Sequence, residues 1–361
     1  MKISIIRGAF LNPFELQNYY PLAKEHDIQA ISSLFPINDK ILLPLKKLPS
    51  LTDIPLPAYK YPLLNRVFGD AHYLFGLEKT ITNSDIAHVA ETYYHYTAQA
   101  IKAKQRGLVK KVVSTVWEVI PHNNEGIRGR KKFKEISRQH IDHFLCPTKL
   151  AKEALIRERV GESKISVIPM GFDLSKFKTS LNKKPTRNLN ILFIGRLVPE
   201  KGITELFKAF LSLKEKFPNL YLTVVGSGSL KTDITNVRGI KVLRLPYSEI
   251  QKEYQKADIF CLPSKTTKNW KEQFGMVLVE AMASGLPIVT TATGAIEEVC
   301  GEAVLYAKQA SVQDLKIKLE NLITSPSLRK NLSKLARKRA QKLYDCQKTA
   351  LKINSLYQSL F

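Results

Sequence analysis

Two acidic residues lie on either side of a predicted helix N-terminus in the C-terminal half of the sequence. Residues 270–289 read WKEQFGMVLVEAMASGLPIV, with Glu272 and Glu280 eight positions apart. The pattern predicts a helix from about residue 275 to 284 that ends at Gly285. Because the first turn of a helix has unpaired N–H groups and the positive end of the dipole, the backbone at 274–277 can hold phosphate oxygens. We therefore expect an anionic ligand at this helix start.

Each glutamate then has a candidate chemical task. Glu272 precedes the helix, where a carboxylate can bind sugar hydroxyls and stabilise a positive glycosyl centre. Glu280 lies about one and a half turns inside the helix, where it can accept hydrogen bonds from the two hydroxyls of a ribose. Together they predict a nucleotide-sugar ligand. The spacing alone equally fits a solvated Glu272 and a Glu280 that forms a salt bridge on its helix.

Two glycine-containing loops upstream are further candidates for ligand contact. In ILFIGRLVPEKGITELFKAF (191–210), Gly195 permits a tight turn, and Arg196 and Lys201 are two cations that suit a diphosphate. The loop has neither the GxxxxGK[ST] nor the GxGxxG phosphate-binding pattern, and a solvated loop also explains its charges. In VVGSGSL (224–230), the glycines either let the backbone approach a ligand or form a plain turn.

Short apolar runs alternate with helical patterns along most of the chain. The runs are 2–6, 28–33, 86–90, 110–116 and 143–147 in the first half, and 189–195, 220–226, 240–246, 258–263 and 287–291 in the second. Continuous apolar strands joined by helices are typical of parallel sheets that are covered on both faces. We predict an α/β protein with two similar halves, in which ligands bind at the carboxyl ends of the strands.

Composition along the chain suggests the boundaries. The polar stretch KTSLNKKPTRN (178–188) predicts an inter-domain linker at 179–188, between domains 1–178 and 189–340. A long basic helical pattern without strands runs from about 328 to the last segment, 341–361. Residues 36–62 contain six prolines, which favours irregular structure inserted in the first domain. This insertion is either a surface excursion or a lid that faces an acceptor or a membrane.

Charge and composition limit the partners. The 361 residues carry a formal net charge of +24, which predicts an anionic partner: lipid head groups, nucleic acid or a phosphorylated substrate. No window is long and apolar enough for a membrane-spanning helix, and MKISIIRGAF lacks the features of a signal peptide. The four cysteines have no metal-binding spacing, so we expect buried thiols, no metal and a cytoplasmic location.

The first half contains a strongly basic stretch. Residues 101–138 hold eleven Lys/Arg and three Glu. They form either a solvated helix face or a patch that adheres to the anionic inner face of a membrane, where each cation contributes about 1 kcal/mol. No nucleic acid is expected as a partner, because the sequence has no zinc-finger pattern, RNP-type aromatic motif or homeodomain-like arm.

The motifs in combination resemble those of the retaining glycosyltransferases of family 4. EQFGMVLVE looks like their E-x7-E signature, and IGRLVPEKG, VVGSGS, ADIFCLPS and AMASGLPIVTTATGAIEEV occur in the order of that family. VIPMGFDLSKFK (167–178) resembles a further family segment, with Met170 where asparagine is usual. The resemblance is strong over roughly residues 165–361 and weak over the first half.

This resemblance implies a GT-B architecture, in which two Rossmann-like domains face each other across a cleft and the C-terminal helix (341–361) packs back on the first domain. It implies that Arg196 and Lys201 hold the donor diphosphate, that Glu272 contacts the sugar and that Glu280 binds the ribose. The catalytic set would be Glu272, Arg196, Lys201 and Glu118. The remaining donor-binding positions would be Gly195, Gly226, Leu245, Phe274, Gly275, Met276 and Val277.

The first half departs from the family on the acceptor side. Only Gly8 follows the first strand, where many members have a glycine pair, and Trp117 and Glu118 stand where many have a histidine. Glu118 would serve as the acceptor base or as a hydroxyl ligand, while Trp117 packs or stacks on a sugar. His88, at another strand end together with Glu91, is either a structural histidine or an acceptor contact.

The resemblance thus implies a retaining, metal-independent hexosyltransferase without a cofactor, which uses a UDP-, GDP- or ADP-linked sugar. Front-side attack is the expected route. The expected acceptor is lipid-linked or a glycan at the cytoplasmic membrane face, and the protein is a monomer or dimer. The alternatives are a soluble transferase that acts on a small sugar or metabolite, and a basic nucleic-acid-binding protein without catalysis.

Overall fold

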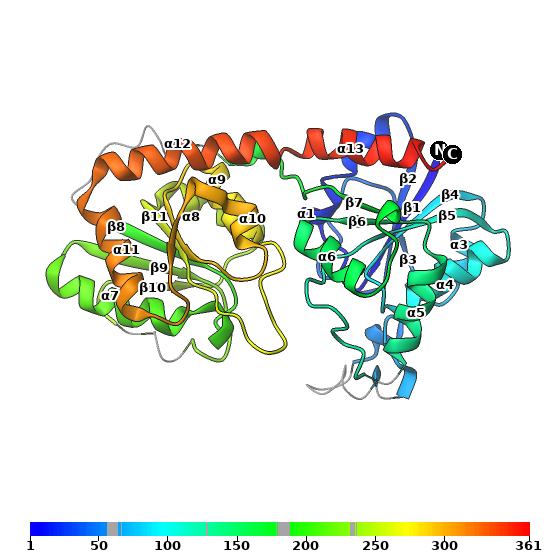
Figure 1. Ribbon diagram of the computed structural model, residues 1–361, viewed down its shortest axis with the longest axis horizontal. Coiled ribbons are helices and arrows are strands. Elements are labelled where there is room, and N and C mark those ends of the chain that lie inside the picture. Colours follow the sequence, from blue (N-terminus) through cyan, green and yellow to red (C-terminus); the bar gives the residue numbers. More distant parts are fainter. Residues whose placement is uncertain are drawn as a thin grey trace. The chain divides into compact units, whose positions relative to one another are not determined.

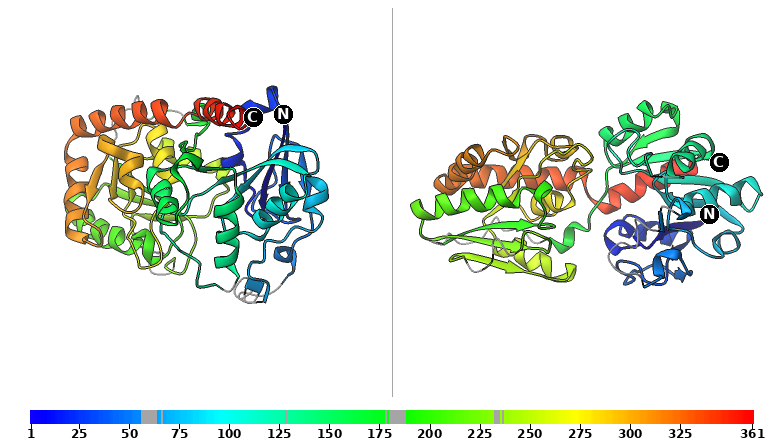
Figure 2. Two further views of the ribbon diagram at one scale, coloured as in Figure 1. Left: turned by 45° about the vertical axis from the view of Figure 1, so that its right-hand side comes forward. Right: turned by 90° about the horizontal axis from the view of Figure 1, so that it is seen from below.

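The protein consists of two α/β units, each built on one parallel sheet. The computed structural model describes residues 1–55, 64–65, 67–127, 129–177, 179, 188–231, 235 and 237–361. One unit comprises Met1–Phe172 and Cys346–Phe361, and the other comprises Asp173–Asp345. Helices cover both faces of the sheet in each unit (Figures 1 and 2). Most of the expected linker at 179–188 lies outside the described residues.

The first unit has a seven-stranded sheet in the order β3-β2-β1-β4-β5-β6-β7. Its strands are β1 (Lys2–Gly8), β2 (Asp27–Ser32), β3 (Leu45–Lys47), β4 (Ser84–Ala90), β5 (Val109–Thr115), β6 (His143–Cys146) and β7 (Ile165–Val167). Its helices are α1 (Pro13–Leu16), α3 (Leu77–Thr80), α4 (His95–Gln105), α5 (Arg130–His140), α6 (Lys149–Arg157) and α13 (Cys346–Gln358). Short 3-10 helices are η1 (Tyr20–Lys24), η2 (Leu51–Asp53) and η3 (Glu162–Lys164).

Two hydrophobic clusters cover the two faces of this sheet, as the continuous apolar strands require. Ile6 and Val112 belong to one cluster, together with apolar side chains of α3, α4 and α6. Their strand neighbours Ile5 and Val113 belong to the other cluster, in which α13 contributes Ala350, Ile353, Leu356 and Tyr357. The C-terminal helix is therefore part of the core of the first unit.

The second unit has a six-stranded sheet in the order β10-β9-β8-β11-β12-β13. Its strands are β8 (Leu189–Ile194), β9 (Leu220–Val225), β10 (Ile240–Leu243), β11 (Ile259–Leu262), β12 (Ile288–Thr291) and β13 (Leu305–Ala307). Its α-helices are α7 (Ile203–Lys216), α8 (Tyr247–Lys256), α9 (Met276–Ala283), α10 (Ile296–Cys300), α11 (Val312–Thr324) and α12 (Pro326–Leu343). Its 3-10 helices are η4 (Leu174–Lys176), η5 (Pro199–Lys201) and η7 (Gly301–Ala303).

The boundaries differ slightly from those predicted. The division between the units falls after Phe172 rather than at residue 178, and α13 begins at Cys346 rather than at 341. None of the helices in the described ranges is both long and apolar enough to span a bilayer. All four cysteines are buried free thiols, as expected from their spacing.

Candidate functional site

A glycine-dependent turn positions Lys201 at the carboxyl edge of the second sheet. Gly202 follows η5 with φ +69°, and an added Cβ would lie 1.9 Å from the carbonyl oxygen of Pro263. Only glycine tolerates both this backbone conformation and this close approach. The loop after β8 is thereby packed against the loop after β11, which continues to Glu272.

Lys201 and Glu272 form a direct ion pair. The Lys201 Nζ lies 2.7 Å from Glu272 Oε2, which also accepts a hydrogen bond from the Ser264 hydroxyl at 3.2 Å. The same ammonium lies 4.7 Å from the centre of the Trp270 ring. The Lys201 side chain is 14% exposed and the Glu272 side chain is 11% exposed. The pair is therefore accessible to a ligand but largely shielded from bulk water.

The backbone of Glu272 is fixed by the loop after β12. Its carbonyl oxygen accepts a hydrogen bond from Ala295 N at 2.9 Å, and an added Cβ on Gly294 would lie 2.0 Å from that oxygen. Three loops that follow the carboxyl ends of β8, β11 and β12 therefore hold the carboxylate in place. This convergence is the arrangement expected of a ligand site in an open parallel sheet.

The start of α9 lies directly after Glu272. Gly275 is its N-cap residue with φ +79°, and no side chain caps the helix. Within the described part of the chain, the N–H groups of Gly275, Met276 and Val277 form no hydrogen bond. Unpaired N–H groups and the helix dipole make this end attractive to an anion. The backbone donors predicted from the sequence are thus available next to the ion pair.

Glu280 lies deeper than the sequence suggested. Its side chain is buried, and its two carboxylate oxygens accept hydrogen bonds from the hydroxyls of Tyr247 at 2.6 Å and Tyr254 at 2.8 Å. Burial raises the pKa of this carboxyl to about 7, although the two tyrosine hydrogen bonds act in the opposite direction. The salt bridge considered as an alternative is therefore absent among the described residues, and a ribose would have to compete with Tyr247.

A pocket of about 280 Å³ opens at the carboxyl ends of β8, β9 and β10. Gly195 and Arg196 line one side, Gly226 lies at the end of β9, and Arg244 and Leu245 follow β10. An added Cβ on Gly226 would lie 1.9 Å from the Gly195 carbonyl oxygen, so this glycine is required for packing of the two loops. The Arg196 side chain is 62% exposed, and its ion pair among the described residues is with Glu200 at 3.3 Å, which leaves the guanidinium accessible to a ligand.

The sequence analysis missed three side chains of this region. Arg244 adds a second cation to the pocket, and Tyr247 and Tyr254 hold Glu280. The tyrosines are seven residues apart, which is about two turns of helix and places both on one face of α8. This periodicity was visible in the sequence, but it did not indicate which element the face would meet.

The acceptor-side residues predicted in the first unit have different environments. Gly8 has φ +52°, and an added Cβ would lie 3.2 Å from Tyr96. Trp117 borders a small hollow of about 20 Å³, which has room for about one water molecule. Neither observation identifies an acceptor contact, and both residues remain candidates.

His88 has the environment of a structural histidine, the first of the two alternatives left open by the sequence. It is fully buried, with Nδ1 2.5 Å from the Tyr357 hydroxyl and Nε2 2.8 Å from Thr115 Oγ1. Burial, with a smaller contribution from the nearby Arg7, lowers the pKa of the imidazole well below its usual value. Both ring nitrogens are used to join β4 to β5 and α13, so none is available to a substrate.

Glu118 is occupied by its own loop. Its Oε1 accepts hydrogen bonds from the backbone N–H groups of Val119 at 3.0 Å and Ile120 at 2.9 Å. Its Oε2 accepts one from the Asn123 side chain at 2.8 Å. A role as acceptor base would require these contacts to be released, and in this structure Glu118 instead orders the loop after β5.

Glu91 is the less satisfied carboxyl at the same sheet edge. It is 5% exposed and has φ +58°, an uncommon conformation for a non-glycine residue. Its Oε1 accepts a hydrogen bond from Trp117 N at 2.9 Å, whereas Oε2 is buried without a hydrogen-bond partner among the described residues. Burial, reinforced by the charge of Glu118, raises the pKa of Glu91 to about 8.

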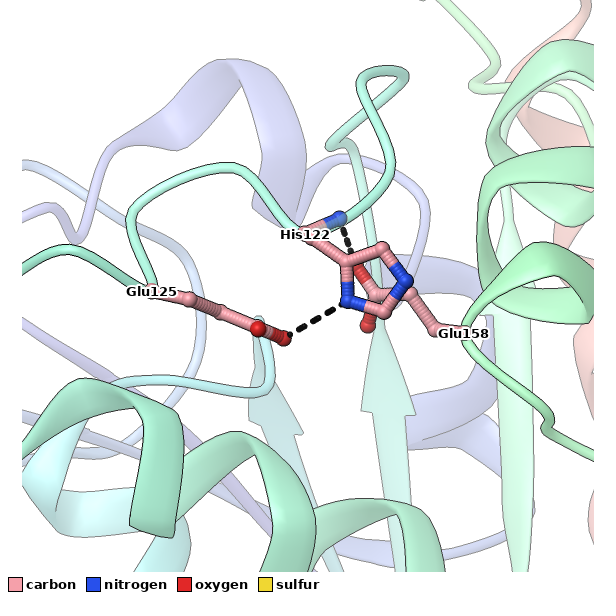
Figure 3. A group of neighbouring side chains, drawn as sticks. All are labelled: His122, Glu125 and Glu158. Carbon is pink, nitrogen blue, oxygen red and sulfur yellow. Dashed lines mark hydrogen bonds and ion pairs between the residues drawn. The ribbon is translucent and has the colours of Figure 1, made fainter.

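One group of side chains in the first unit has the composition of a metal site. His122, Glu125 and Glu158 have ligand atoms within 4.8 Å of one another (Figure 3). However, Lys134 lies 2.6 Å from Glu158 Oε1, and Arg138 lies 2.9 Å from Glu158 Oε2 and 3.0 Å from Glu125. Two cations already neutralise the two carboxylates, so the group is an ion-pair network that ties the 118–125 loop to α5 and α6.

Comparison with known sequences places this site in a family. Residues 175–339 match the profile described as "Glycosyl transferases group 1", and residues 38–176 match "Glycosyltransferase Family 4". This chain belongs to the family 4 glycosyltransferases. The resemblance inferred from the sequence motifs is thereby confirmed, and it extends into the first half, where the motifs were weak.

Individual relatives of this glycosyltransferase are distant. The chain is 26% identical over 65% of its length to the capsular polysaccharide biosynthesis glycosyltransferase CapM of Staphylococcus aureus, of which the match covers 67%. It is 25% identical over 84% of its length to the uncharacterized glycosyltransferase MJ1178 of Methanocaldococcus jannaschii, of which the match covers 84%. Several other curated relatives are matched over about half of their own length.

A solved structure supports the fold class. HepE of Anabaena, determined in complex with UDP and glucose, aligns with a TM-score of 0.78 at 16% identity and covers 99% of this chain and 100% of its own. Likeness at this level of identity concerns the fold. The predicted GT-B class with two Rossmann-like domains is therefore confirmed for this glycosyltransferase.

Proposed function

We propose that this glycosyltransferase moves a hexose from a nucleoside-diphosphate sugar to an acceptor hydroxyl with retention of configuration at the anomeric carbon. The observation that carries the proposal is the 2.7 Å contact of Lys201 with Glu272 beside the unpaired N–H groups of α9. A cation, a carboxylate and a helix start within one set of loops match the charges of a sugar diphosphate. The UDP bound to HepE supports a nucleotide-linked donor.

Each group has a task in this reaction. Lys201, Arg196 and the N-terminus of α9 stabilise negative charge on the departing diphosphate. Glu272 binds hydroxyls of the donor sugar and stabilises positive charge at the anomeric carbon. The bond from this carbon to the phosphate oxygen breaks, the acceptor oxygen bonds to the same face, and its proton passes to the leaving phosphate. In this front-side route, the phosphate itself accepts the proton.

The remaining donor contacts follow from the pocket. The ribose is proposed to reach Glu280 after displacing the Tyr247 hydroxyl, and the base to lie along Leu245 between the glycine loops. Arg244 and Arg196 both line this pocket and add positive charge for the phosphates. We propose that these cations take the place of a metal ion, so no metal is required.

For the acceptor, we propose a lipid-linked saccharide or a glycan at the cytoplasmic face of the membrane. The net charge of +24 favours an anionic surface, and the relative CapM is a glycosyltransferase of capsular polysaccharide biosynthesis. The competing proposal is a soluble enzyme that acts on a small sugar or metabolite. Turnover of a water-soluble acceptor without any stimulation by anionic vesicles would favour this competitor.

A donor panel is the primary test. Thermal unfolding is measured with UDP-, GDP- and ADP-sugars, because a ligand stabilises the fold by RT ln(1 + [L]/Kd). The stabilising donor is then incubated with acceptor extracts in EDTA, and the product linkage is determined by NMR. The proposal requires stabilisation by at least one donor and a product with retained anomeric configuration. An inverted product, or activity that depends on added Mg²⁺, would contradict the mechanism.

A further inference from the structure

The exposed apolar side chains of this protein are unevenly distributed. Nine of the sixteen large apolar residues that are exposed in the described ranges lie on the loops that follow β1, β2 and β3. One of the nine, Leu42, lies just before β3 begins, toward the other edge of the sheet, and is left out. The other eight are Phe10, Leu34, Phe35, Ile37, Ile54, Val67, Phe68 and Phe75, with Phe35 74% and Ile37 66% exposed. In a parallel sheet these loops share the carboxyl edge. We refer to these eight residues as the carboxyl-edge apolar surface.

Hydrogen bonds join the loops of this surface to each other. Ile37 N donates to Ala9 O at 2.9 Å, which attaches the loop after β2 to that after β1. The carboxylate of Asp53 accepts hydrogen bonds from the N–H groups of Leu34 and Phe35, both at 3.1 Å. Phe75 N donates to Pro49 O at 2.9 Å. The apolar side chains are therefore presented by one connected set of loops rather than by separate segments.

The N-terminus of α5 adds positive charge at one side of this surface. An added Cβ on Gly129 would lie 2.9 Å from Gly69 Cα, and Arg130 pairs with Asp70 at 2.9 Å. These contacts join the segment that directly follows the exposed Val67 and Phe68 to the start of α5, where Lys131 and Lys132 are exposed.

Four other cations of the basic stretch, which lie on the last turn of α4 and at the start of β5, are at the opposite edge of the sheet and are paired. Lys102 and Arg106 lie 3.7 Å and 2.7 Å from the Glu78 carboxylate. Lys104 pairs with Asp142 and Lys110 with Asp85, each at 2.7 Å. Paired surface charges attract an external anion less than unpaired ones do. The structure therefore divides the single basic patch expected from residues 101–138 between two edges.

We propose that the carboxyl-edge apolar surface is the part of the protein that enters the interface of an anionic lipid bilayer. Phe35, Ile37 and Phe68 insert among the acyl chains, and Lys131 and Lys132 contact the head groups. Apolar side chains rimmed by lysines fit such an interface. A second copy of this chain fits it less well, because two molecules with a net charge of +24 repel each other.

This inference rests on the proposed function and adds a location to it. The membrane contact lies at the carboxyl edge of the sheet, where ligands bind in parallel α/β proteins. An acceptor held in the bilayer would then reach the first unit without leaving the membrane. The arrangement differs from adhesion by a basic helix, since it depends on insertion of apolar side chains as well as on charge.

The test is flotation of the protein with phosphatidylcholine vesicles that contain or lack phosphatidylglycerol. The triple variant F35S/I37S/F68S is expected to lower the partition coefficient on the anionic vesicles about tenfold or more. The variant K131Q/K132Q is expected to weaken binding at low salt and to reduce its salt dependence. Matched controls are L335S/L351S, which alters two exposed leucines on α12 and α13, and K102Q/K110Q at the opposite edge.

Each result decides the inference. Wild-type vesicle binding by F35S/I37S/F68S, or an equal loss in L335S/L351S, would overturn it. A concentration-dependent dimer in sedimentation velocity that the triple variant abolishes, without vesicle binding by the wild type, would assign the surface to a second copy instead. Calorimetric titration with UDP, GDP and ADP is run on every variant. If the wild-type protein binds none of the three nucleotides, the proposed function is contradicted. The result on vesicle binding is not affected.

Discussion

The Nζ atom of Lys201 lies 2.7 Å from Oε2 of Glu272, although 71 residues of sequence separate them. Each side chain holds the other in position, and both adjoin the start of α9. The pair therefore acts as a unit, in which removal of either member leaves the other displaced and partly desolvated.

Replacement of Lys201 or Glu272 by alanine should each lower kcat by about 10²–10³-fold, the scale for loss of one transition-state stabiliser. Because the two groups are in contact, the double variant should lose much less than the product of the single effects. Initial rates with the stabilising donor measure this, with Lys208→Ala on the exposed face of α7 as the control. Fully multiplicative losses would show that the residues act independently.

Glu280→Ala should raise the donor KM more than it lowers kcat, because ribose contacts are similar in the ground and transition states. Tyr247→Phe should lower the donor KM, since it removes the hydroxyl that occupies Glu280 Oε1. Tyr254→Phe, at the buried oxygen, is the comparison and should not lower KM. A large kcat loss in Glu280→Ala with unchanged KM would instead place this carboxyl in the chemical step.

Gly202→Ala should destabilise the second unit by about 3 kcal/mol or more, because a φ of +69° is combined with an overlap at Pro263 O. Gly107→Ala is the matched control, with φ +74° but no atom within 4 Å of the new Cβ, and should cost about 1 kcal/mol. Urea unfolding is followed by Trp270 fluorescence in a Trp117→Phe background for Gly202→Ala, and by Trp117 fluorescence in a Trp270→Phe background for Gly107→Ala, because Gly107 lies in the first unit. Equal costs for both variants would show that the contact with Pro263 has no effect.

Glu91 should make the first unit less stable as pH rises. Burial raises its pKa from 4.5 to about 8, so the folded state retains a proton that the unfolded state releases above pH 4.5. Stability is therefore lost between about pH 4.5 and pH 8, at up to about 1.4 kcal/mol per pH unit. Glu91→Gln cannot ionise and should lose this dependence, whereas the exposed Glu153→Gln should retain it. Urea unfolding at several pH values, followed by Trp117 fluorescence in a Trp270→Phe background, measures the difference.

Much of the fold followed from local pattern. Buried parallel strands must be apolar on both faces, so their runs were visible in the sequence, and the helix after Gly275 was found within one residue of its observed ends. The partners of buried polar groups were not visible, because they depend on how distant elements pack. The contacts of Glu280 with Tyr247 and Tyr254 and of His88 with Tyr357 are of this kind.

The role of two glycines could not be predicted from the sequence either, again because it depends on contacts between distant segments. The pattern VVGSGS allowed either a ligand approach or a plain turn, and the structure shows that a Cβ on Gly226 or Gly228 would overlap the loop after β8. The requirement for glycine is a property of two loops that meet in space. No single stretch of sequence contains it.

The contribution of α13 to the core of the first unit has a consequence for synthesis on the ribosome. Residues 173–345 are contiguous and can fold once they have emerged, whereas the sheet made from the earliest residues lacks Ile353, Leu356 and Tyr357 until translation reaches the last helix. The part of the protein that is made first is thus completed last. Until then its nascent chain exposes the apolar face that α13 covers, and this is the interval in which a chaperone would be needed.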